Sequence, residues 1–304
     1  MIAGFLALAP VALVIALGWG LNRAAFPGEG FWAPAERVTY YLLMPSLIVG
    51  SLARAQVDII DVAPMISVLI LSLLLAGSAM LVLRPVLTDD GPAFTSLFQG
   101  AVRANIYAAM ACTAALYGEP GLTLAAVAVA AVVPTVNLMS VAVLSRYAAD
   151  KPANWTAVAG AMARNPMIIA CGLGALLNLT GLGAPGVISA LLDILGPAAL
   201  AIGLLCVGAG LSFSGLGRYR RGIAAACAAK LLVLPVLAAL GCAAFGVSGV
   251  SAGVVIFFAA SPTASSAFIL ARQMGGDATL MAQTVAASTL AAAITLPMAL
   301  AIFL

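Results

Sequence analysis

The sequence predicts an all-α polytopic membrane protein with ten transmembrane helices in two inverted five-helix repeats. Hydrophobic residues make up 64% of the chain and charged residues 8%, and the mean hydropathy is +1.18. A soluble domain of 304 residues could not keep that much apolar surface away from water. A bilayer removes this constraint, and a spanning helix needs about 20 mostly apolar residues. Ten apolar stretches in succession therefore predict ten spans.

Charged residues and Gly/Pro positions place the ends of these spans. The expected spans, in chain order, are 2–21, 37–54, 62–86, 93–117, 120–145, 157–178, 185–214, 220–245, 249–271 and 278–303. The first has no basic segment before it and runs directly into further spans. We therefore interpret it as a mature helix and not as a cleaved signal peptide.

Basic residues predict the orientation. With the N-terminus outside, the cytoplasmic loops carry Arg23, Arg37, Arg84, Arg146, Lys151, Arg164, Arg218, Arg220, Arg221 and Arg272. The opposite loops carry only Arg54, a bias of ten to one that predicts both termini outside. We expect a multi-pass protein of the bacterial inner (cytoplasmic) membrane, with periplasmic termini. The net charge of +3 thus reflects topology in the lipid bilayer, and no nucleic-acid partner is expected.

The reactive residues argue against an enzyme. The chain has no histidine, the commonest general base, which speaks against a hydrolase or a histidine proton relay. Its cysteines lie in apolar spans without a CxxC pair, as expected of small core residues, and predict no zinc site. They are Cys112, Cys171, Cys206, Cys227 and Cys242. We expect no metal and no cofactor.

Two halves of the chain, residues 1–150 and 151–304, match weakly in the same order. The matched pairs are YLLMPSLIVG (41–50) with DILGPAALAI (193–202), and RANIYAAMACTAALYGE (103–119) with SPTASSAFILARQMGGD (261–277). An odd number of spans per half gives the halves opposite orientations, the inverted repeat of many secondary transporters. No loop is long enough to hold an additional domain.

Helix breaks inside a bilayer occur only where protein or a wet cavity covers the backbone. Pro45, Pro197 and the Pro134–Asn137 segment predict either breaks or simple kinks, and the two readings stay open. The fourth span clusters Arg103 and Asn105 near its middle. The ninth has the sequence SPTASS over residues 261–266, also near its middle. Because these positions are equivalent in the two repeats, we expect a substrate site where the two broken helices meet.

Intramembrane charges are costly and usually functional. Arg103 lies about ten residues into its span, roughly 15 Å deep at ~1.5 Å per residue, too deep to reach the interface easily. We expect it to bind substrate or take part in gating, with a structural bond to backbone carbonyls as the alternative. Lys230 can pair, snorkel or touch substrate, and Asp193 is expected at the interface. No glutamate is expected inside a span, which argues against a protein-borne proton relay.

Several segments resemble the auxin efflux carrier family, which includes the plant PIN exporters and bacterial carriers assigned to malonate or malate. They are ARNPMIIACGLGALLNLTG (163–181), with Asn165-Pro166 opening the sixth span, ILGPAALAIGLLCVGAGL (194–211), YYLLMPSLIVGSLA (40–53) and the Asn105 segment. The resemblance covers essentially the whole chain. The long hydrophilic loop of the plant proteins is absent, and the fourth span has Asn-Ile-Tyr where many relatives have Pro or Gly nearby.

The resemblance implies a scaffold domain and a transport domain, with the fourth and ninth helices crossing at the site of a substrate carboxylate. The residues it points to are Asn105, Pro262, Thr263, Ser46 beside Pro45, and Asn137. From the residue pattern we add Arg103, Ser265 and Ser266 as substrate-binding candidates. A homodimer stays open.

These observations favour a secondary-active or potential-driven carrier of small organic anions, such as carboxylates, working by alternating access. No Walker motif is present, so the driving force is expected to be the membrane potential, a proton or another ion gradient. The alternative is a membrane sensor or receptor that binds its ligand without transporting it. An integral-membrane enzyme lacks a catalytic set.

Overall fold

The described residues of the computed structural model are almost entirely helical. They are residues 2–28, 30–55, 59–148, 155–181, 183–212 and 219–304. The elements are α1 Ile2–Arg23, α2 Trp32–Val38, η1 Thr39–Leu43, α3 Met44–Ala53, α4 Ile59–Leu87, α5 Gly91–Val102, α6 Ile106–Tyr147, α7 Trp155–Ala163, α8 Pro166–Leu179, α9 Gly186–Ala209, α10 Arg220–Ala228, η2 Ala229–Val233, α11 Leu234–Phe245, α12 Gly249–Ala260, α13 Ser266–Gln273 and α14 Ala278–Phe303. The two η elements are π-helical turns. The all-α prediction is confirmed.

Length and surface composition make this a membrane-embedded protein. Within the described residues, five helices are long and apolar enough to cross a bilayer: 60–87, 106–147, 186–209, 220–245 and 278–303. Large apolar side chains also cover the outside of the molecule, and Val86, Leu179 and Val187 are 84%, 85% and 87% exposed. A surface of this kind is stable against lipid and not against water.

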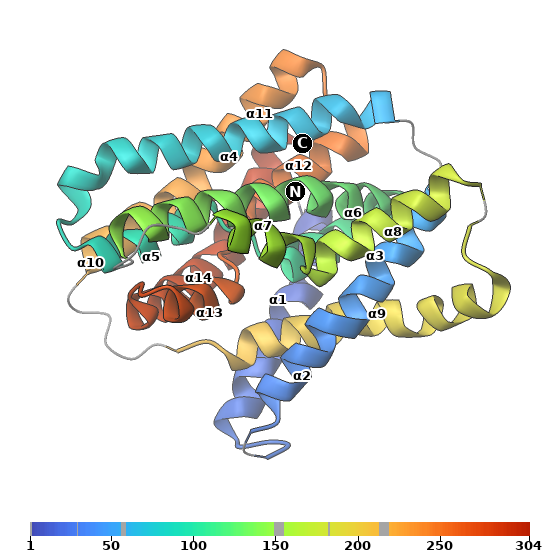
Figure 1. Ribbon diagram of the computed structural model, residues 1–304, viewed down its shortest axis with the longest axis horizontal. Helices are drawn as coiled ribbons and strands as arrows, with labels where there is room; N and C mark the ends of the chain where they lie inside the picture. Colours follow the sequence, from blue (N-terminus) through green and yellow to red (C-terminus); the bar gives the residue numbers. More distant parts are fainter. Residues whose placement is uncertain (1, 29, 56–58, 149–154, 182, 213–218) are drawn as a thin grey trace.

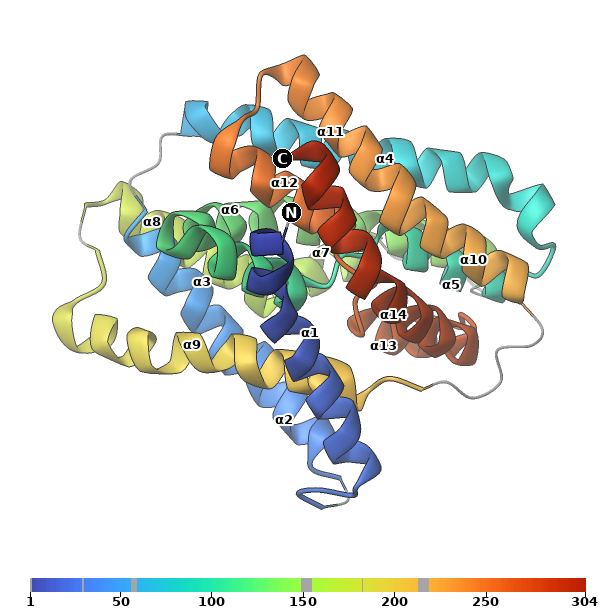
Figure 2. The same ribbon diagram turned by 180° about the vertical axis from the view of Figure 1, so that it is seen from behind.

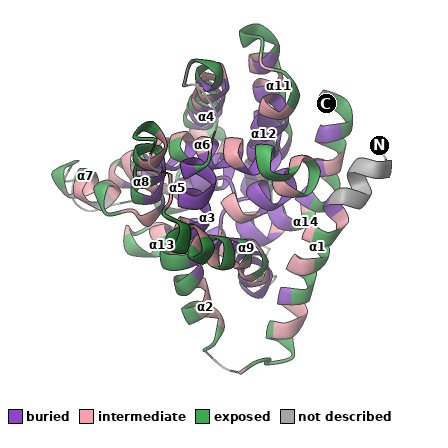
Figure 3. Ribbon diagram, turned by 90° about the vertical axis from the view of Figure 1, so that its right-hand side faces the viewer, coloured by how far each residue is buried: buried purple, intermediate pink, exposed green. Residues whose placement is uncertain are grey.

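The helices pack in two groups (Figures 1 and 2). In the first group α1 packs against α9, and α3 packs against α8 and α9. In the second group α4 packs against α11 and α6, α12 against α6 and α11, and α5 against α14 and α6. Figure 3 shows that buried residues concentrate inside the second group, whereas α1 and α2 present mostly exposed or half-buried residues. The second group therefore holds most of the core.

Helices lie at the positions of the expected spans, with differences at some ends. The second span begins at Trp32, five residues before its expected start at 37, because α2, η1 and α3 run on without interruption. The fourth and fifth spans join in α6, where Gly118 alone is non-helical, with φ 60° and ψ −145°. The expected repeat boundary at 150–151 lies outside the described residues, as do Arg218 and the predicted end of the seventh span.

Pro45, Pro134 and Pro197, for which breaks and kinks were both open, do not end their helices. Pro134 and Pro197 lie inside the continuous helices α6 and α9. Pro45 follows η1, and Pro235 follows η2 in the same way. A proline lacks an N–H and clashes with the carbonyl four residues earlier. The wider π turn before Pro45 and Pro235 accommodates the ring without ending the helix.

Candidate functional site

The fourth and ninth spans are each broken at mid-length, and the two breaks meet. Residues 103–105 separate α5 from α6, and residues 261–265 separate α12 from α13. The two segments run antiparallel, with an isolated β-bridge between Ala104 and Thr263. We call this meeting point the crossing. It joins segments about 160 positions apart in the sequence.

Backbone hydrogen bonds hold the crossing together. The Asn105 N–H donates to the Pro262 carbonyl at 2.9 Å, and the Ala264 N–H donates to the Arg103 carbonyl at 3.3 Å. An unsatisfied backbone group is costly away from water. Each broken segment supplies the partners that the other one lacks, which is why both helices can break in the interior.

Side chains complete the crossing. The fully buried Thr263 donates its Oγ1 hydrogen to the Gly100 carbonyl at 2.7 Å, at the end of α5. The Asn105 Oδ1 accepts the Ala108 N–H at 3.1 Å and so caps the start of α6. Asn105 and Thr263, both predicted from the sequence, therefore lie together here.

Arg103 is the charged centre of the crossing. It is only 8% exposed, and its guanidinium donates to Ser140 Oγ and Ser266 Oγ, both at 3.4 Å. Those distances are long for N–H···O hydrogen bonds. Its Nε and the Nδ2 of Asn105 are buried and have no hydrogen-bond partner among the described residues. Buried donors in native proteins are nearly always satisfied, so this pair has capacity for a further acceptor.

Two helix N-termini add positive potential at the same place. α6 begins after Asn105 and α13 begins after Ser265, so both point their N-terminal ends toward the crossing. Each such end carries a partial positive charge of roughly half an elementary charge. The C-terminal ends of α5 and α12 also reach the crossing and carry the opposite partial charge, so the net charge there comes from the guanidinium of Arg103, which favours an anion over a cation.

Glu36 is a residue that the sequence reasoning missed. It lies in α2, and its Oε1 accepts a hydrogen bond from Ser265 Oγ at 3.1 Å. Glu36 lies one residue before the expected start of the second span at 37, but in a helix that begins at Trp32 and continues into that span. The signal was present: Pro34 in the first turn is typical of a helix start. Glu36 brings a carboxylate from the first helix group to the crossing.

Other predicted residues lie elsewhere or take other partners. Ser46 donates to the Leu42 carbonyl within its own helix. In the fifth span the contact to Arg103 comes from Ser140, one turn beyond the predicted Asn137, which is half-buried. Asp193, which is expected at the interface, forms an ion pair with Arg54 at 2.6 Å, in which both side chains are about half-exposed.

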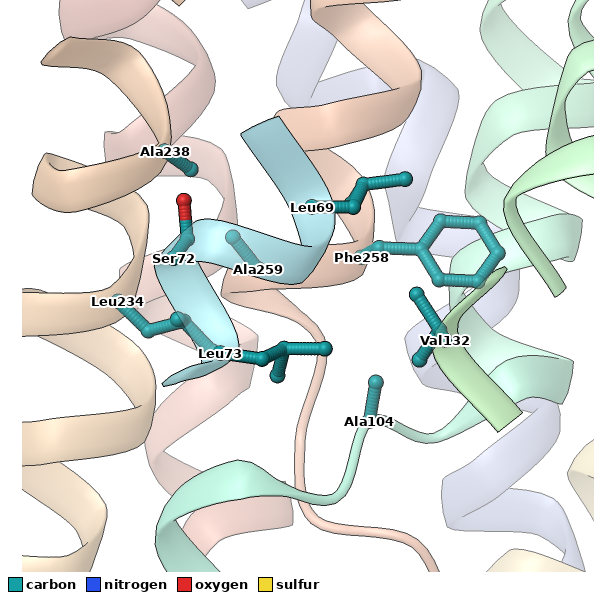
Figure 4. Close-up of a pocket in the computed structure, with 9 residues that line it drawn as sticks. All are labelled: Leu69, Ser72, Leu73, Ala104, Val132, Leu234, Ala238, Phe258 and Ala259. Atoms are coloured by element: carbon teal, nitrogen blue, oxygen red, sulfur yellow. The ribbon is translucent and has the colours of Figure 1, made fainter. Parts of the chain in front are cut away.

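Beside the crossing the structure is nearly closed. A cavity of about 10 Å³ touches Ala104 and is lined mainly by apolar side chains, among them Leu69, Leu73, Val132 and Phe258. Figure 4 shows Ala104 on its non-helical segment, facing this cavity. The volume is about that of a single probe sphere of water size and leaves no room for an organic anion there. A ligand of that size would need the surrounding helices to move.

Compared with models of known protein families and with curated proteins, the chain matches none.

Proposed function

We propose that this protein is a secondary-active or potential-driven carrier of small carboxylates that works by alternating access. The main support for this proposal is the Arg103 guanidinium. It is buried at the crossing, its Nε has no partner among the described residues, and its contacts to serines are long. A guanidinium offers a donor fork that matches a carboxylate. A ligand that supplies the missing hydrogen-bond acceptor to such a buried donor removes the free-energy cost of leaving that donor unsatisfied.

The proposed architecture is ten membrane-crossing segments in two inverted repeats, residues 1–150 and 151–304. The equivalent mid-span breaks and the antiparallel bridge between Ala104 and Thr263 support it. Broken helices meeting at mid-depth are typical substrate sites of inverted-repeat transporters. We also propose membership of the auxin efflux carrier family, on the segment resemblances described above.

Alternating access is supported by the two helix groups. The group of α1, α3, α8 and α9 contacts the other group mainly through α6, whereas both broken helices belong to that other group. We propose that the group with the crossing moves against the first group and carries the anion. Driving forces are the membrane potential, a proton or another ion gradient. A proton gradient is among these driving forces because the Glu36 carboxylate, which can bind and release a proton, lies beside Ser265 at the crossing.

Uptake into proteoliposomes tests this proposal. Purified protein would be reconstituted and offered radiolabelled monocarboxylates and dicarboxylates, with an amine and a neutral sugar as controls. Saturable uptake of at least one carboxylate, absent from protein-free vesicles, is expected. Binding of a carboxylate without any uptake would instead favour the sensor, and uptake of the amine or sugar alone would contradict the anion assignment.

A further inference from the structure

Lys230 is a buried cation that the anion site does not use. It lies in η2, is fully buried, and donates from Nζ to the carbonyls of Phe258 at 3.0 Å and Ala259 at 2.7 Å. These carbonyls form the C-terminal end of α12, directly before the break. Among the described residues no carboxylate forms an ion pair with Lys230. Its partners are therefore carbonyl oxygens of a half-helix end.

The sequence of the break explains why these two carbonyls are available. In a continuous helix the Phe258 carbonyl would accept the N–H of residue 262, but residue 262 is proline and has none. The Ala259 carbonyl would accept the Thr263 N–H, which instead donates to Ser288 Oγ at 3.1 Å. Lys230 replaces both missing donors.

A broken helix end does not need a charge for this task, as the opposite half of the crossing shows. At the end of α5 the Gly100 carbonyl accepts the neutral hydroxyl of Thr263, and the Arg103 carbonyl accepts the Ala264 N–H. At the end of α12 the Ser261 hydroxyl already donates to the Phe258 carbonyl at 3.0 Å. A full positive charge in this interior costs desolvation that a second hydroxyl would avoid. Intramembrane charges of this kind are usually functional.

In transporters built from broken helices, carbonyls at half-helix C-terminal ends coordinate the coupling cation. We propose that the Lys230 ammonium takes the place of such a cation at the end of α12, so that the protein works without sodium. This inference rests on the proposed transport function. A tethered cation stays with the protein when the substrate leaves. A sodium gradient therefore cannot drive the cycle, and removal of the ammonium opens the place to a free Na⁺.

The first test uses the wild-type protein. Carboxylate uptake into proteoliposomes would be measured in sodium chloride and in choline chloride of equal ionic strength. Equal rates are expected. Uptake that requires Na⁺ would overturn the proposal, and this arm does not depend on the folding of any variant.

The second test replaces the ammonium. Lys230→Ala leaves space at the two carbonyls, whereas Lys230→Met fills that space with an apolar chain. The thermal melting temperature of each purified protein would be followed as NaCl replaces choline chloride. We expect Na⁺ to raise the melting temperature of Lys230→Ala and to leave Lys230→Met and wild type unchanged. No Na⁺-specific shift in a folded Lys230→Ala protein would overturn the proposal.

The melting experiment needs no substrate, so a failure of the transport proposal does not affect its outcome. If wild type does transport, uptake by Lys230→Ala should be lost in choline chloride and return as Na⁺ is raised. Uptake by Lys230→Ala that equals wild type in choline chloride would show that no cation is needed at the end of α12, and the proposal would fail.

Discussion

Arg103 combines full charge, burial and weak internal contacts. Its two serine contacts at 3.4 Å leave most of its hydrogen-bonding capacity free. Arg103→Gln should weaken binding of a carboxylate substrate by about 2–5 kcal/mol, because it removes one partner of a buried charge pair. Arg103→Lys keeps the charge but loses the fork of donors, so its loss should be smaller. Apparent affinities from uptake against substrate concentration would measure both.

Arg84→Gln is the matched control for this prediction. The Arg84 guanidinium lies over the rings of Phe94 and Tyr147, neither of which belongs to the crossing, so this substitution should leave the affinity unchanged. If Arg103→Gln binds the wild-type substrate with unchanged affinity, Arg103 is a structural residue. The anionic character of the substrate would then lose its main support.

Asn105 has two separable roles, since its Oδ1 caps α6 and its Nδ2 lacks a described partner. Asn105→Ser keeps a good helix cap but removes the amide donor, so transport should fall while the melting temperature stays near wild type. Asn105→Ala removes both functions and should also cost about 1 kcal/mol of stability. Equal transport by Asn105→Ser and wild type would mean that Nδ2 does not contact substrate.

Glu36 places a negative charge next to the proposed anion site. Glu36→Gln keeps an oxygen that can accept the Ser265 hydrogen bond but removes the charge. Because like charges repel in a poorly solvated site, the variant should bind a carboxylate more tightly at neutral pH. Uptake competition would measure this, with Glu119→Gln, an exposed position, as control. Weaker binding by Glu36→Gln would indicate that Glu36 assists the anion and does not oppose it.

The sequence identified individual site residues where a polar or charged side chain stands in an apolar span. Arg103, Asn105 and Thr263 are polar groups at mid-span, and the cost of burying them points to the crossing. Ser140 could not be found this way, because a small hydroxyl in an apolar span is common and bonds readily to its own helix. Glu36 was missed because the expected start of its span was set by Arg37.

At the scale of helices, α1 and α9 approach each other through glycines. A methyl group on Gly18 would overlap the Leu205 carbonyl, and one on Gly208 would overlap the Ile15 carbonyl. Small residues of this kind allow close packing of membrane helices. Gly208→Ala should therefore destabilise the protein by about 1–3 kcal/mol, seen as a lower melting temperature in detergent.

Gly20→Ala is the control on the same helix pair, because Gly20 has open space around it. It should stabilise α1 slightly, by about 0.5–1 kcal/mol, since alanine is the better helix former. Equal melting temperatures for Gly208→Ala and Gly20→Ala would contradict the close contact between α1 and α9.

The helices show when a proline in the sequence indicates a helix break. Breaks occur where a polar cluster accompanies the interruption, as at residues 103–105 and 261–265. Pro45, Pro134 and Pro197 leave their helices continuous, although Ser46 follows Pro45 and Thr135 follows Pro134. A proline alone removes one hydrogen bond, which a π turn or a kink absorbs, whereas a full break needs partners for several backbone groups.

At the scale of the whole molecule, we predict that both termini face the periplasm. The start of α1 and the end of α14 lie near each other in Figures 1, 2 and 3, and the two helices are in contact. The distribution of basic residues predicts that this side is outside. Alkaline phosphatase fused after Leu304 should be active, and green fluorescent protein fused there should be dark. A fusion after Ala148 should give the opposite result, and reversed patterns at both positions would contradict the topology.

The positions of the apolar helices could be predicted because partition into lipid is a property of each segment alone. The packing of the spans could not. The contact of Gly18 with Leu205 joins positions that no local pattern relates, and it depends on which surfaces fit closely. The crossing could be predicted only because both of its segments place polar residues at mid-span, where burial in lipid is costly.

Gly118 gives α6 a corner at a backbone conformation that favours glycine, with φ 60° and ψ −145°. One arm of α6 runs from this glycine back to Asn105, and the other carries Ser140 back to Arg103. The vertex lies about 20 Å from Asn105 at ~1.5 Å per residue. If both arms move as rigid bodies, a change in the distance between Asn105 and Ser140 changes the angle between the arms at Gly118. A fluorescent label at the exposed position Glu119 would then report movements around the buried Arg103 guanidinium from a distance.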